Sequence, residues 1–63
     1  MIIQLRTIKG EIILVNIYHI MCVVPYKNGL LLFLSTGLDY YIDYDLDKFI
    51  KILSNENVVV INK

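Results

Sequence analysis

Turn-forming residues recur at short intervals along this chain, and their spacing constrains the fold more than any other feature. Gly10, Asn16, Gly29 and Gly37 separate apolar runs whose length is typical of strands, about 4–8 residues. Asn28 precedes Gly29, and this pair predicts a two-residue type I′ turn in which both central residues have a positive φ. The spacing therefore predicts an antiparallel β protein with short connections.

The apolar runs between these turns give the expected strands. Leu30–Leu34 is apolar at every position, which predicts a central strand or one buried in an interface. Pro25 has no N–H to donate, so its strand is expected at a sheet edge or to end there. We expect strands at Ile2–Ile8, Glu11–Val15, Ile20–Tyr26, Leu30–Ser35, Leu38–Ile42 and Val58–Ile61.

One amphipathic helix is expected before the last strand. Its apolar stripe is formed by Leu46, Phe49, Ile50 and Leu53. Asp43 or Asp45 is expected to cap its start, and Asn55 to end it. The element order β-β-β-β-β-α-β predicts one mostly β domain of the α+β class over residues 1–63. We expect a small twisted antiparallel sheet, or a partly open barrel, with the helix packed on it.

The chain is unusually apolar for its size. Hydrophobic residues make up 57% of its 63 positions, more than a small interior can hide. Burial and conformational entropy nearly balance in so small a domain, which then needs a disulfide, a metal or a partner. Cys22 is the only cysteine, so an intrachain disulfide is excluded. We therefore expect a homo-oligomer, with Phe33 and Leu34 at the interface.

Charge and hydropathy argue against two classes of partner. Basic and acidic residues are equal in number, and the basic ones are scattered, whereas nucleic-acid binding needs a basic patch. The apolar stretch 12–24 is interrupted by Asn16 and His19, so a membrane-spanning helix is not expected. Met1–Arg6 does not have the pattern of a signal peptide. We expect a cytoplasmic protein.

Three aspartates at alternate positions, Asp43, Asp45 and Asp47, match the start of a calcium-binding loop. The sixth position of that loop should be glycine and is Lys48. Its twelfth should be glutamate and is Ser54. We therefore interpret the aspartates as the start of the helix, where negative charge is favourable, and expect no metal there.

His19 and Cys22 are the other candidates for chemistry. Zinc requires about four ligands, and the chain has no second histidine or cysteine. We interpret Cys22 as a small buried apolar residue and His19 as part of a connector. The glycines do not form a phosphate-binding pattern. No catalytic residue, cofactor site or metal site is expected.

Tyrosines and aspartates gather near the end of the predicted sheet. Tyrosine is common at interfaces because its ring is buried while its hydroxyl stays hydrated. The tyrosines are therefore candidates for contact with a partner protein, although alternate tyrosines could instead fill the core. The cluster consists of Tyr40, Tyr41 and Tyr44 together with Asp39, Asp43 and Asp45.

The spacing of several residues resembles that of short flagellar FlbD-like proteins. The similarity covers about residues 2–53 and implies a small, non-enzymatic accessory protein. That family usually places proline after its asparagine, whereas Asn16 here precedes Ile17. The matching positions are Leu5-Arg6-Thr7, Gly10, Val15-Asn16, Ile20, Val23, Phe33, Leu34, Gly37, Tyr41, Ile42, Leu46, Phe49 and Ile50.

The composition, charge and motifs of the sequence are compatible with three classes of function. The favoured one is a non-enzymatic protein-interaction or assembly module that forms a homo-oligomer. The alternative is a phage-encoded inhibitor of a bacterial defence enzyme, which would act by surface binding or by sequestering a small nucleotide. The absence of alanine and tryptophan fits an AT-rich bacterial or phage genome. An enzymatic function is the least favoured of the three, because the titratable residues of this chain do not match any known catalytic arrangement.

Overall fold

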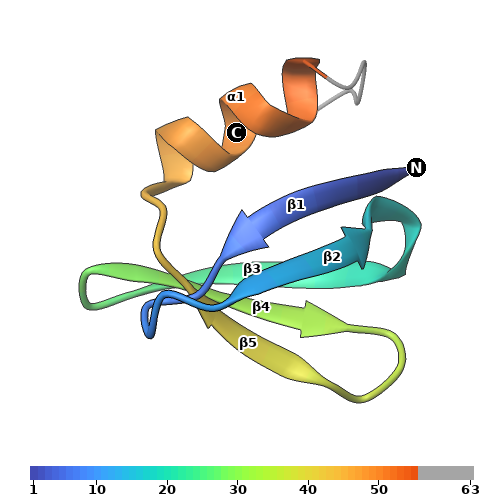
Figure 1. Cartoon of the computed structure of the whole chain (residues 1–63), viewed down its shortest axis with the longest axis horizontal. Helices are drawn as coiled ribbons and strands as arrows, with labels where there is room; N and C mark the ends of the chain where they lie inside the picture. Colours follow the sequence, from blue (N-terminus) through green and yellow to red (C-terminus); the bar gives the residue numbers. More distant parts are fainter. Residues whose placement is uncertain (56–63) are drawn as a thin grey trace.

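The computed structural model describes residues 1–55, which form five strands and one helix (Figure 1). This arrangement confirms a mostly β fold with a single helix after the fifth strand. The predicted strand Val58–Ile61 lies outside the described residues. The elements are β1 (Ile2–Arg6), β2 (Ile12–Asn16), the 3-10 turn η1 (Ile17–His19), β3 (Ile20–Tyr26), β4 (Gly29–Leu34), β5 (Asp39–Ile42) and α1 (Leu46–Asn55).

The strands divide into two antiparallel sheets and do not close into a barrel. One sheet is the β1–β2 hairpin, and the other has the order β3-β4-β5. A single bridge between Thr7 and Ile42 joins them where β1 and β5 end. Beside it the N–H of Asp43 donates to the carbonyl of Arg6 at 2.9 Å. As predicted, apolar β4 is the central strand of its sheet, and β3 with its proline lies at the edge.

The β3–β4 turn lies one residue earlier than the type I′ prediction placed it. Its two central residues are Lys27 and Asn28, and Lys27 has the positive φ of 51°. Gly29 belongs to β4, where a Cβ would collide with the carbonyl of Ile42 and meet the Tyr41 ring at 2.8 Å. Gly29 is therefore needed for the close approach of β5, and the prediction that it lies within the turn is wrong.

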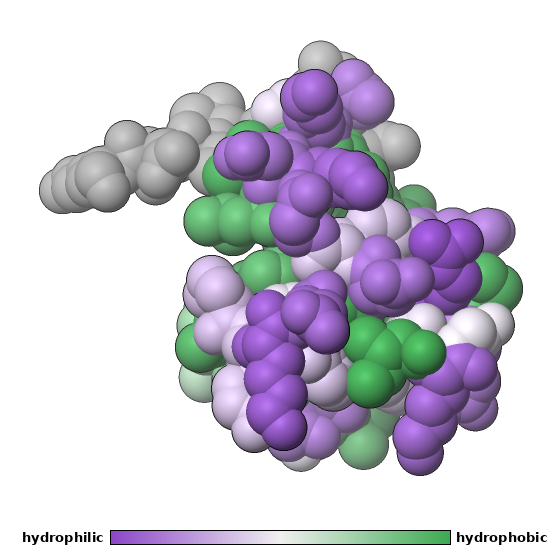
Figure 2. All heavy atoms as spheres, turned by 90° about the vertical axis from the view of Figure 1, so that its left-hand side faces the viewer, coloured by the Kyte–Doolittle hydropathy of each residue, from purple (hydrophilic) through white to green (hydrophobic). Residues whose placement is uncertain are grey.

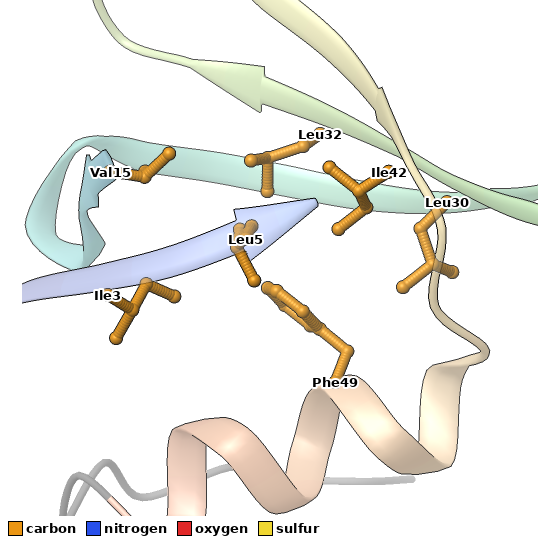
Figure 3. Packing of buried hydrophobic residues seen from close by; sticks show 7 residues of the cluster. All are labelled: Ile3, Leu5, Val15, Leu30, Leu32, Ile42 and Phe49. Carbon is orange, nitrogen blue, oxygen red and sulfur yellow. The ribbon is translucent and has the colours of Figure 1, made fainter. Parts of the chain in front are cut away.

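The core lies between the two sheets and the helix (Figure 3). In β1, buried residues alternate with exposed ones, because successive side chains of a strand point to opposite faces. The helix α1 lies alongside β1 (Figure 1), and Phe49 points from it toward Leu5 (Figure 3). The buried apolar residues are Ile3, Leu5, Val15, Leu30, Leu32, Ile42 and Phe49.

Two polar side chains set the boundaries of local elements. The Asp45 carboxylate accepts a hydrogen bond from the Lys48 N–H at 2.8 Å, so Asp45 is the cap that the sequence predicts. The described part of α1 runs to Asn55, and the predicted helix stop at this residue adjoins the part of the chain outside the described residues. At η1, the side-chain oxygen of Asn16 accepts from the Tyr18 N–H at 3.1 Å and fixes the connector between the sheets.

Candidate interaction surface

The three-stranded sheet turns an apolar surface away from the core. Its strand register places Cys22 beside Phe33 and places Leu31 between Val24 and Tyr41. These side chains alternate with the core residues of the same strands, so they share the opposite face. We call this surface the outer face, and it consists of Cys22, Val24, Tyr26, Leu31, Phe33 and Tyr41.

The residues of the outer face are only partly covered by one another. Val24 and Tyr26 are 43% and 46% exposed, and Leu31, Phe33 and Tyr41 are half-buried. Figure 2 looks at the end of the molecule that carries the β3–β4 turn and shows apolar residues at the surface among polar ones. The solvent-facing side of a sheet is usually polar, so a face that is apolar in all three strands is typical of a surface that contacts another molecule.

Two tyrosines of this face, Tyr26 and Tyr41, contact each other near the β3–β4 turn. The Tyr41 hydroxyl donates to the carbonyl of Tyr26 at 2.9 Å. Their rings meet edge to face, with centroids 5.8 Å apart, and the Lys27 ammonium lies 5.3 Å from the Tyr26 ring centre. Because these contacts fix the rings before any partner arrives, a partner would order fewer side chains on binding.

The two ends of the outer face carry opposite charges. Lys27 lies at the β3–β4 turn, next to the Tyr26–Gly29 pair. Asp39 lies opposite Phe33 and therefore at the other end of the strands. Both charged residues are exposed, and the ion pair found within residues 1–55 joins other residues, Arg6 and Asp43. The outer face is thus an apolar centre with a cationic and an anionic end.

The structure separates the residues predicted for the interface. Phe33 and Tyr41 belong to the outer face, whereas Leu34 and Tyr40 pack against the core from the inner face. Tyr44 also packs against the core, and its hydroxyl accepts a hydrogen bond from a β1 backbone N–H. The interface prediction therefore narrows to Phe33 and Tyr41. The sequence pattern does not indicate the other residues of this face, because only the strand register brings them beside Phe33 and Tyr41; they are Cys22, Val24, Tyr26 and Leu31.

Cys22 is exposed, and the prediction that it is buried is wrong. The register of β3 and β4 shifts between Ile20 and Cys22, so Met21 forms a bulge. Beyond this bulge Cys22 lies on the outer face. His19 instead contacts Ser35, with 3.0 Å between its Nδ1 and the hydroxyl oxygen, as fits a residue of the connector.

The three aspartates have separate roles. Asp43 forms an exposed ion pair with Arg6 at 3.4 Å, Asp45 caps α1, and Asp47 lies in the first helical turn. Over residues 1–55, no group of three or more histidine, cysteine or acidic side chains is arranged to hold a metal ion. In the same range, no helix is long and apolar enough to cross a membrane.

A shallow hollow lies between the β1–β2 turn and β5. Its volume is about 240 Å³, below the range of about 300–1,000 Å³ that is usual for small-molecule sites. Lys9 and Glu11 bring opposite charges to its rim. The remaining lining residues are Thr7, Ile8, Tyr40 and Tyr41. Its size and its single cation are a poor match for a nucleotide.

Comparison with protein-family models, curated proteins and solved structures finds no match to this chain. The resemblance to FlbD-like proteins stays a prediction.

Proposed function

We propose that this chain is a non-enzymatic assembly module that binds a second copy of itself through the outer face. The observation that carries the proposal is the charge arrangement of that face. A twofold axis that lies in the contact plane and runs across the strands would bring Lys27 of each copy toward Asp39 of the other, because the two residues lie at opposite ends of the strands. Opposite charges then meet at both ends while the apolar centres cover each other, which is the self-complementarity that an isologous contact requires.

The apolar centre supports the same proposal. Leu31 lies in the middle of the face, between Val24 and Tyr41, and Phe33 is its neighbour on the same face of β4, so these side chains would lose water on contact. Aromatic residues near the centre of an interface often contribute most of its binding energy. The charged ends would then set the orientation of the two copies, because like-charged ends would repel in any parallel arrangement.

Native mass spectrometry of the full chain tests the apolar part of this contact. Phe33→Asp introduces a charge among the apolar side chains of the outer face and should decrease the assembled fraction strongly. Leu38→Asp is the matched control, since Leu38 is an exposed leucine outside the outer face. Equal masses for the wild type and a folded Phe33→Asp variant would contradict the proposal.

A charge-swap series tests the orientation. Lys27→Glu or Asp39→Lys alone brings like charges together and should weaken assembly. The double variant restores opposite charges at each end and should recover it. Recovery would not be expected if the partner were a different protein, such as the enzyme target of an inhibitor. That alternative predicts extra mass from a second protein in preparations from the natural host.

A further inference from the structure

The strand β2 has a free edge in the part of the chain that the structure describes. At the two ends of the hairpin, Thr7 N–H donates to the Glu11 carbonyl at 2.8 Å and Ile17 N–H donates to the Met1 carbonyl at 3.0 Å. Along an antiparallel strand, the N–H and C=O groups of one residue point toward the neighbouring strand, and those of the next residue point away from it. Glu11 and Ile17 face β1, so Leu14, midway between them, directs its N–H and C=O away from β1.

Within the described residues, this edge lacks the charged side chains, prolines and bulges that usually hinder edge pairing. The sequence of β2, Ile12–Asn16, contains no charged residue and no proline. Leu14 and Ile12 are 70% and 57% exposed. By contrast, the edge strand β3 has a bulge at Met21 and a proline at Pro25, and both features hinder the addition of a strand. The free edges of β2 and β3 are therefore very different as surfaces for strand pairing.

We propose that β2 pairs antiparallel with β2 of a second copy, with Leu14 on the twofold axis. In this register each Leu14 N–H donates to the Leu14 carbonyl of the other copy, and Asn16 lies opposite Ile12. Ile13 lies opposite Val15, so two inward-facing side chains are matched. The contact joins two β1–β2 hairpins into one continuous sheet.

Side-chain chemistry agrees with this register. Glu11, the charged residue next to β2, lies opposite Ile17 of the second copy, so no like charges meet. The two Leu14 side chains become neighbours on the exposed face, flanked by Ile12 on each side. Cross-strand apolar pairs of this kind stabilise sheets. The most exposed leucine of the described chain is thereby covered.

This edge contact is separate from the outer-face contact, and each can form without the other. A chain with both contacts assembles beyond a dimer. Native mass spectrometry should therefore give dimers for Leu14→Lys, which retains the outer face, and dimers for Phe33→Asp, which retains the edge. The double variant should be a monomer. Leu38→Lys is the control for an added lysine and should keep the wild-type mass.

Hydrogen–deuterium exchange of the full chain gives an independent readout. The amides of Leu14 and Asn16 should be protected in the wild type and in Phe33→Asp, and the protection should decrease on dilution. Leu14→Lys should abolish it at position 16. Protection that persists in the monomeric double variant would mean that another segment of the same chain covers the edge. That result, or unprotected amides in an assembled wild type, would overturn the edge contact without affecting the outer face.

Discussion

The backbone N–H of Arg6 donates a hydrogen bond to the hydroxyl of Tyr44, 38 positions later, at 3.1 Å. This bond joins the end of β1 to the connection between β5 and α1. Arg6 also contacts Asp43 through its side chain and through its backbone carbonyl, so one residue of β1 holds the connection through three contacts. The position of the helix relative to the first hairpin depends on this junction.

Replacing Tyr44 by phenylalanine should lower stability and leave assembly unchanged. The ring still packs against the core, but the bond to Arg6 is lost, at a cost of about 0.5–1.5 kcal/mol. Because that N–H is at the surface, water replaces the hydroxyl and the low end of the range is expected. Urea unfolding at a fixed protein concentration measures the change in the free energy of unfolding. A lower assembled mass for the variant would contradict the inference that Tyr44 lies outside the interface.

Gly29→Ala should destabilise the fold by about 1–3 kcal/mol, because the added methyl group collides with Ile42 and Tyr41. Gly37 is the matched control: it has a φ of 90° and open space around it, so alanine there strains only the backbone, by about 1–2 kcal/mol. Asparagine tolerates positive φ. Thermal unfolding should thus give a higher unfolding temperature for Gly37→Asn than for Gly37→Ala. Gly29→Asn should unfold at no higher temperature than Gly29→Ala.

Asp45→Ala should cost about 1 kcal/mol, because it removes the acceptor for the Lys48 N–H at the start of α1. Asp45→Asn keeps a side-chain oxygen there and should be nearly neutral. Asp47→Ala is the control for lost charge in the same turn. Chemical unfolding of the three variants checks this order, and equal losses at positions 45 and 47 would mean that charge, not the cap bond, matters.

The Cys22 thiol should report assembly through the outer face. It is exposed in the single chain and lies beside Phe33, so a second copy on this face should shield it. The rate of labelling by a maleimide should therefore fall as the protein concentration rises. In Phe33→Asp the labelling rate should be independent of protein concentration. A wild-type labelling rate that does not change with concentration would mean that the outer face is not covered in the assembly.

Local features of this fold were predictable from sequence. The Asp45 cap depends on residues close together in the chain, and the structure has it. Of the predicted helical stripe, Phe49 is in the core and Leu53 packs against it, whereas Leu46 is exposed. The exposure of Cys22 was missed because a bulge at Met21 changes which face the strand presents.

Features that depend on distant residues were harder to foresee. The β3–β4 turn was misplaced because Gly29 is required by β5, which follows it by ten residues or more. The separation of Leu34 from Phe33 follows from strand alternation and could have been inferred once the strand was recognised. The outer face required the register of three strands, which the spacing of turns alone does not determine.

The bulge and the proline of β3 also limit the kind of polymer that this chain can form. Fibrils that grow along the hydrogen-bonding direction need two receptive edges on every molecule, one to join the previous copy and one to accept the next. Here Met21 and Pro25 make the β3 edge a poor template, so a copy bound at β2 does not offer the next copy an equivalent site at β3. Growth of a continuous sheet from β2 of one copy to β3 of the next is thus hindered by two residues of β3.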